Sequence, residues 1–243
     1  RREAFLNFEN NVTLVATNGF TVEGTSDGVV SLNAAIGHSV SGTVTVSSGT
    51  LHLHDGRLPG IASMNIPGGG ASLANRNAGD RLPDDLAVTL SSGGSFSFGG
   101  QGGAANTETI DKISSGSFGN IGANAGAGKL VLANGIERAA GSKATFYMNG
   151  LDDSDANVSI TSGKPAQDTA LPWIYRNDAG SFAQYSSSTD RFAPVTTVEG
   201  ATPTDLSTWD TIYASGTDNV IHHQYPGDYT GTLDGDVQVE TFD

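Results

Sequence analysis

The chain has 243 residues, of which 33 are Gly, none is Cys and 16% are charged. This length accommodates one large all-β domain or two smaller ones, and the lack of Cys excludes disulfides, thiol catalysis and Cys-ligated zinc. The chain carries 12 basic and 26 acidic residues, a formal net charge of −14, which repels polyanions, so we expect no nucleic-acid partner.

The N-terminal sequence RREAFLNFEN lacks the apolar region and cleavage site of an export signal. FLNFENNVTLVA and DGDVQVETFD, near the two ends, both have the character of strands. We therefore interpret the chain as a mature or excised piece of an exported protein, extracellular or at the cell surface, whose signal is not in this piece. No apolar run approaches the ~20 residues that span a bilayer, so we expect no membrane span.

Alternation of apolar and polar residues with period two predicts a series of short strands. Gly, Asn, Asp and Ser bound each of them, as in Asn18-Gly19 and Asn134-Gly135, where positive φ is accepted cheaply. The β-branched content of TETIDKI (107–113) also favours a strand there. The alternating segments are VTLVA (12–16), FTVE (20–23), VVSL (29–32), TVTV (43–46), TLHLH (50–54), LAVTL (86–90), SFSF (95–98) and KLVL (129–132).

Two architectures share this rhythm, a parallel β-solenoid and an antiparallel β-sandwich. The phrase GTVTV (42–46) is followed closely by GTLHL (49–53), as when a solenoid coil turns a corner between two faces. Val, Leu, Ile and Phe would then stack inward from coil to coil, with Thr, Ser and Asn outward. We expect the parallel β-helix and keep the sandwich as the alternative.

Composition changes near residue 150. Residues 1–150 hold 26 of the 33 Gly, whereas residues 151–243 hold both Trp, five of the six Tyr and five of the eight Pro. We therefore expect Gly-rich coils in 1–150. In 151–243 we expect a continuing β-rich region with longer loops and aromatic anchors, available for capping or assembly contacts.

The order of several blocks resembles the autotransporter-associated β-strand repeats of long bacterial surface proteins. The resemblance implies a right-handed parallel β-helix that is exported and acts as a stalk, passenger or fibre. It transfers no catalytic residues and does not extend to residues 199–243. The blocks are FENNVTLVATNGFTVEGTSDGVVSLNAAIGHSVSGTVTVSSGTLHL (8–53), DRLPDDLAVTLSSGGSFSFGGQ (80–101), TETIDKI (107–113), GKLVLANGIERAAGSKATFYMNG (128–150) and LPWIYRNDAGSFAQYSSSTDRFAPVTTV (171–198).

Two acidic clusters are candidates for chemistry. Asp80, Asp84 and Asp85 would suit glycoside hydrolysis or Ca²⁺ binding, but a turn fixed by Pro83, in which Arg81 pairs locally, is the simpler interpretation.

The second cluster is Asp152, Asp153 and Asp155, the start of a calcium-loop pattern without its later Gly and Glu. These three carboxylates are candidate ligands for a structural Ca²⁺, or else part of a turn. We expect no other cofactor.

Aromatic residues and histidines supply the remaining candidates. Trp173, Tyr175 and Tyr185 are candidate glycan-binding residues and, together with Phe182, would equally form the core of the second half. His52 and His54 share one face of a strand and could hold a metal, although a solvent-facing pair is the simpler interpretation.

Local signatures of common hydrolases and nucleotide enzymes do not occur in the sequence, and we expect no enzyme. The leading hypothesis is a structural extracellular protein, a β-helix subunit or repeat of a self-assembling bacterial surface fibre. Its partners would be further copies, joined head to tail or by strand addition. The alternative is an adhesin or glycan-binding passenger module. A carbohydrate-active β-helix enzyme ranks third.

Overall fold

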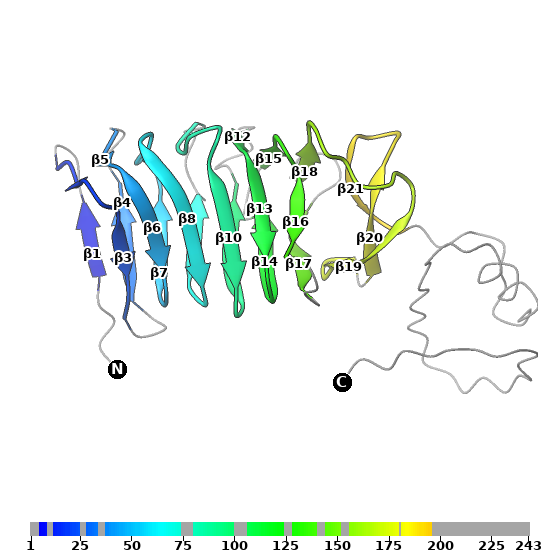
Figure 1. Cartoon of the computed structure of the whole chain (residues 1–243), viewed down its shortest axis with the longest axis horizontal. Coiled ribbons are helices and arrows are strands. Elements are labelled where there is room, and N and C mark those ends of the chain that lie inside the picture. The colour runs from blue at the N-terminus through cyan, green and yellow to red at the C-terminus, as the bar shows by residue number, and fades with distance from the viewer. Residues whose placement is uncertain are drawn as a thin grey trace, which may run out of the picture.

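The computed structural model describes residues 5–8, 12–24, 28–33, 37–73, 80–99, 106–123, 128–139, 144–151, 156–179 and 181–195. Every regular element in these ranges is a β-strand, and the strands stack along the long axis of the molecule (Figure 1). The chain is all-β, as the sequence predicted.

Each coil passes three sides in turn. Sheet 1 consists of β1 (Phe5–Phe8), β4 (Val29–Leu32), β7 (Thr50–Leu53), β9 (Gly70–Leu73), β11 (Gly94–Phe98), β14 (Phe118–Ala123), β17 (Thr145–Asn149), β19 (Ala170–Arg176), β20 (Ser181–Ser186) and β21 (Arg191–Pro194). Sheet 2 consists of β3 (Phe20–Val22), β6 (Gly42–Val46), β8 (Ile61–Pro67), β10 (Ala87–Ser91), β13 (Lys112–Ser115) and β16 (Ile136–Arg138). The third side, passed between sheets 1 and 2, includes β2 (Val15–Ala16) with β5 (Ser39–Val40), and β12 (Asn106–Ile110) with β15 (Gly128–Leu132) and β18 (Asn157–Ile160).

Neighbouring strands of sheet 1 from β1 to β19 are parallel and one coil apart. Thr50 pairs with Gly70, 20 residues later, and Phe146 pairs with Ile174, 28 residues later. Sheet 2 is parallel in the same way. The fold is therefore a parallel β-helix, as predicted, and not the antiparallel sandwich.

Apolar side chains stack inside the coils in columns. On sheet 2 one column reads Val44, Met64, Val88 and Ile113, all fully buried, and sheet 1 contributes similar columns. Fully burying a side chain of this kind stabilises the fold by about 1.5–3 kcal/mol. Because each column runs through consecutive coils, the coils stabilise one another rather than folding singly.

The predicted strands are confirmed in the described residues, since each alternating segment overlaps a strand. GTVTV and GTLHL form β6 on sheet 2 and β7 on sheet 1, so the predicted corner is confirmed. TETIDKI contributes to β12 and β13. The parallel stacking continues across residue 150, where β18 pairs with β15 and β19 with β17.

The two ends of the stack differ. At the C-terminal end the chain reverses, and β20 is antiparallel to both β19 and β21. At the N-terminal end β1 and β3 are the first strands of sheets 1 and 2, and β2 is the first of its own sheet. Within the described residues, one backbone edge of each of these three strands therefore has no partner strand.

Candidate functional site

Arg81 and Glu108 form a buried ion pair that joins three coils. Their side chains are 1% and 2% exposed, and Arg81 Nε lies 3.6 Å from Glu108 Oε2. Arg81 Nη1 donates hydrogen bonds to the carbonyl oxygens of Leu53 and His54, at 3.0 and 3.1 Å. The carboxylate of Glu108 accepts from the backbone N–H groups of Arg81 and Leu82. The expectation that Arg81 pairs locally is thus wrong, because its partner lies one coil further along.

The acidic residues beside Arg81 occupy a turn. Asp80, Asp84 and Asp85 are exposed, and the N–H of Leu86 donates to the carbonyl of Pro83 at 3.0 Å. Asp80 has a φ of 61°, a conformation that Asp tolerates better than most residues. The turn expected here is therefore present, but Pro83 is its first residue and Asp84 and Asp85 are its central ones. Val88 and Leu90, which follow it, point into the core together with Leu86.

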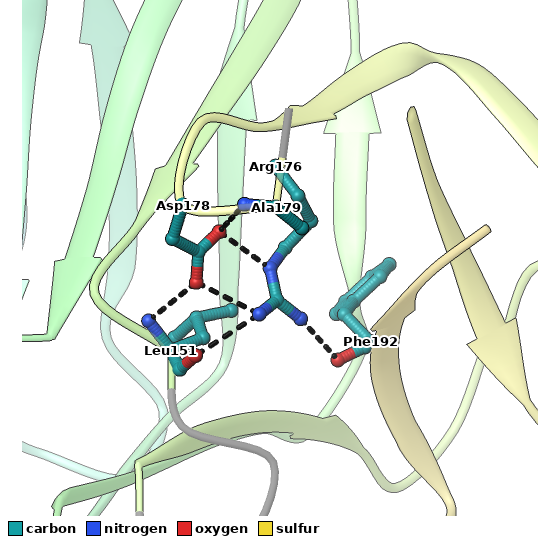
Figure 2. Close-up of polar contacts among 5 residues, drawn as sticks. All are labelled: Leu151, Arg176, Asp178, Ala179 and Phe192. Carbon is teal, nitrogen blue, oxygen red and sulfur yellow. Dashed lines mark hydrogen bonds and ion pairs between the residues drawn. The ribbon is translucent and has the colours of Figure 1, made fainter. Parts of the chain in front are cut away.

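A second buried arginine closes the C-terminal end (Figure 2). Arg176 is 3% exposed and donates from Nε and Nη2 to the two carboxylate oxygens of Asp178, at 2.8 and 2.7 Å. It also donates to the carbonyls of Leu151 and Phe192, at 3.0 and 3.3 Å. Asp178 in turn accepts from the N–H of Leu151 at 3.0 Å. This network ties the turn after β19 to β21 and to the preceding coil.

Tyr185 hydrogen-bonds to the backbone on the outer edge of β18. Its hydroxyl accepts from the N–H of Ile160 at 2.8 Å and lies 3.0 Å from the carbonyl of Asp190, to which it donates. The side chain is fully buried, and burial raises the pKa of its hydroxyl. Lys164 lies over the ring and pairs with Asp190. At the C-terminal end the edge of β18 is therefore covered, whereas β16 and β21, the last strands of sheets 2 and 1, have no further strand beside them among the described residues.

The three glycan-binding candidates do not come together at one surface. The side chain of Tyr185 is buried, and its hydroxyl accepts a hydrogen bond from the backbone of β18. Trp173 packs edge-on against the buried Phe146, with Arg138 over its ring at 5.9 Å. Of the three, Tyr175 belongs to an outward row of sheet 1, in register with Tyr147 of β17.

The N-terminal coil exposes apolar side chains. Leu6 is 54% exposed, Val12 47% and Val15 67%. Phe118 is the one further large apolar residue, among those described, with comparable exposure. Among the described residues, strand edges without partner strands and exposed apolar groups thus coincide at the N-terminal end, which is a feature of interaction surfaces.

The candidate calcium ligands Asp152, Asp153 and Asp155 lie outside the described residues. Within the described ranges, no three His, Asp or Glu side chains gather as a metal site would require. The rings of His52 and His54 lie 5.2 Å apart. Burial, followed by the neighbouring His54, lowers the pKa of His52.

No helix long and apolar enough to cross a membrane occurs in the part of the chain that the structure covers. Comparisons with protein-family models, with curated proteins and with solved structures found no match for this chain.

Proposed function

We propose that this protein is a structural subunit of an extracellular bacterial fibre or surface filament, in which β-helices assemble through their ends. The observation that carries the proposal is a difference between the two ends: at the C-terminal end the chain folds back and covers the edge of β18, whereas at the N-terminal coil, among the described residues, strand edges without partners lie beside exposed Leu6, Val12 and Val15. Open edges beside apolar groups favour the addition of another strand.

At the C-terminal end, β18 and β21 are poor acceptors for a further strand. The Tyr185 hydroxyl occupies the backbone N–H of Ile160 on the edge of β18. The last strand of sheet 1, β21, ends in Pro194, which has no N–H to donate. These features favour strand addition at the N-terminal coil over direct stacking of one end on the other.

The occupant in this proposal is a second copy of the chain. Residues 237–242 read VQVETF, in which Val237 and Val239 alternate with Gln238 and Glu240, as in a strand with one apolar face. Added to the edge of β1, such a segment would pair its backbone and cover Leu6. Because the donor and the acceptor are different surfaces, repetition builds an open fibre rather than a closed dimer.

The use of the charged residues supports a structural rather than a catalytic role. The buried charged side chains make hydrogen bonds between coils, as seen for Arg81, Glu108 and Arg176. The turn carboxylates Asp84 and Asp85 face solvent. The resemblance to autotransporter-associated repeats, with export to the cell surface, is part of the same proposal.

The test is concentration-dependent assembly of the full chain, followed by sedimentation velocity and negative-stain microscopy. We expect the wild type to form filaments and the double variant Leu6→Asp, Val15→Asp to sediment as a monomer, because two charges at the acceptor edge oppose its burial. The matched control Phe118→Asp changes an exposed apolar residue outside the first coil and should still assemble. A wild type that stays monomeric at high concentration contradicts the proposal.

A further inference from the structure

The outer face of sheet 1 becomes aromatic towards the C-terminal end. Asn120, Tyr147, Tyr175 and Phe182 are direct partners across β14, β17, β19 and β20. The rings of Tyr147 and Tyr175 lie 6.3 Å apart, and those of Tyr175 and Phe182 5.7 Å, both edge-on. The same row contains Thr50, Gly70 and Ser95 in earlier coils. The aromatic character is therefore local and not a property of every coil.

A shallow cleft of ≈ 440 Å³ lies beside this row, lined by Phe118, Asn120, Thr145, Tyr147 and Asn177. Phe118 is 47% exposed, and its ring lies against Gly93, where a Cβ would approach it to 2.9 Å. Gly93, at a φ of 86°, thus provides the space that the ring occupies. Aromatic side chains that line a hollow together with a few polar groups are a common feature of ligand sites.

The polar groups of the cleft are held in place. Asn120 Nδ2 donates to the carbonyl of Gly93 at 3.2 Å. The backbone N–H of Asn177 donates to the carbonyl of Met148 at 2.9 Å, and Asn177 stands in the chain between Arg176 and Asp178, which hydrogen-bond to each other. The side chain of Asn120 and the backbone at Asn177 are thus held, which lowers the conformational entropy that these two groups lose when a ligand binds.

The lining defines the chemistry of the ligand. It offers aromatic rings, amides and hydroxyls, and it contains no Asp, Glu, Lys or Arg. Rings pack against apolar faces, while amides and hydroxyls bond to hydroxyl groups. The acidic chain disfavours polyanions. We propose that this cleft and the adjoining Tyr147–Tyr175 row bind an uncharged carbohydrate chain. The inference is independent of fibre assembly, which uses the opposite end of the sheet.

The test is isothermal titration of the full chain with a panel of neutral oligosaccharides: cellohexaose, chitohexaose, laminarihexaose and mannohexaose. We expect saturable binding of at least one of them, weakened about tenfold or more by Phe118→Ala and by Tyr147→Ala, since each removes a ring from the contact. The control Leu6→Ala changes an exposed apolar residue of β1 and should bind as the wild type does. Equal thermal midpoints among the variants show that folding is retained.

Two outcomes overturn the inference: no saturable binding to any member of the panel, or binding whose strength is the same in the wild type, Phe118→Ala and Tyr147→Ala. Leu6→Asp, Val15→Asp separates this site from assembly. If that variant is monomeric and still binds the oligosaccharide, the two functions are distinct. If its binding is lost together with assembly, the contact belongs to the fibre and the cleft is not an independent site.

Discussion

Arg81 and Arg176 are buried cations that each bind main-chain carbonyls of a neighbouring coil. Each is balanced by one carboxylate, Glu108 or Asp178. Burial raises the pKa of Glu108, while the N–H groups of Leu82 and Arg81 and the charge of Arg81 act against that rise. Such a pair is sensitive to the loss of one partner, because the remaining charge is then buried without compensation.

We predict that Glu108→Ala lowers the free energy of unfolding by about 3–5 kcal/mol, because it leaves the buried Arg81 guanidinium without its counter-charge and two backbone N–H groups without their acceptor. Urea unfolding measures this loss. The matched control is Glu137→Ala, which removes the partner of Lys112 from a largely exposed pair and should cost less than about 1 kcal/mol. Equal effects of the two substitutions would contradict the assigned role of Glu108.

The sequence contains both partners of this pair within recognised segments, yet it does not reveal the pairing. Arg81 and Glu108 are 27 residues apart, and which residues meet depends on the length of each coil, which changes from 20 to 28 residues along the stack. The alternation of apolar and polar residues indicates which side chains point inward, but it does not indicate how many residues each coil contains. From the sequence alone, a local pair is therefore the expectation for Arg81. The glycan candidates Trp173 and Tyr185 were chosen for residue type, whereas the cleft residues Phe118 and Asn177 carry no sequence signal of their own.

Among the elements, the first coil is attached to the second through His38. This side chain is 2% exposed, its Nδ1 accepts from the N–H of Leu14 at 3.1 Å, and its ring meets Phe8 edge-on. Nε2 is buried without a hydrogen-bond partner among the described residues. Because Nδ1 accepts a hydrogen bond, the neutral form is required, and burial lowers the pKa of His38.

We predict that the free energy of unfolding falls as the pH drops below about 6.5. The unfolded chain takes up a proton there, whereas folded His38 resists protonation until its own lower pKa is reached. The slope from this one group is at most about 1.4 kcal/mol per pH unit. His38→Asn keeps a hydrogen-bond acceptor that does not titrate. It should therefore remove the contribution of His38 to the pH dependence of the free energy of unfolding, whereas the contribution of His52 should remain. Chemical unfolding of both proteins at pH 7.5 and 5.5 measures the difference; identical pH dependence would contradict the prediction.

Strand positions were more predictable than strand directions. Strictly alternating segments such as 43–46 and 95–98 were recognised because inward and outward residues differ sharply along them. β8 and β14 were missed because Ala62 and Gly119 blur that contrast. The reversal at β20 has no local signal, since period-two alternation is the same in parallel and antiparallel strands. The C-terminal end depends instead on contacts of Tyr185 and Arg176 with residues in the preceding coil.

At the scale of the whole molecule, the described strands stack into a rod (Figure 1) whose two ends differ. At the C-terminal end Tyr185 binds the edge of β18, and the Arg176 network binds β21 and the preceding coil. At the N-terminal end, exposed apolar residues coincide with strand edges that have no partner among the described residues. Addition of a strand from a second copy would bury both. Fibre polarity would follow from this asymmetry, with every subunit pointing the same way.

Site-specific disulfide capture tests this account most directly, because the chain has no Cys of its own. Full-length Leu6→Cys and Val239→Cys are prepared separately, mixed at assembling concentrations and oxidised. The account predicts mixed disulfide dimers between the two variants, since strand addition brings β1 of one copy beside residues 237–242 of another, within the ~7 Å that a disulfide spans between Cα atoms. Mixed dimers no more abundant than in a denatured control, or capture only between two Leu6→Cys copies, would contradict it.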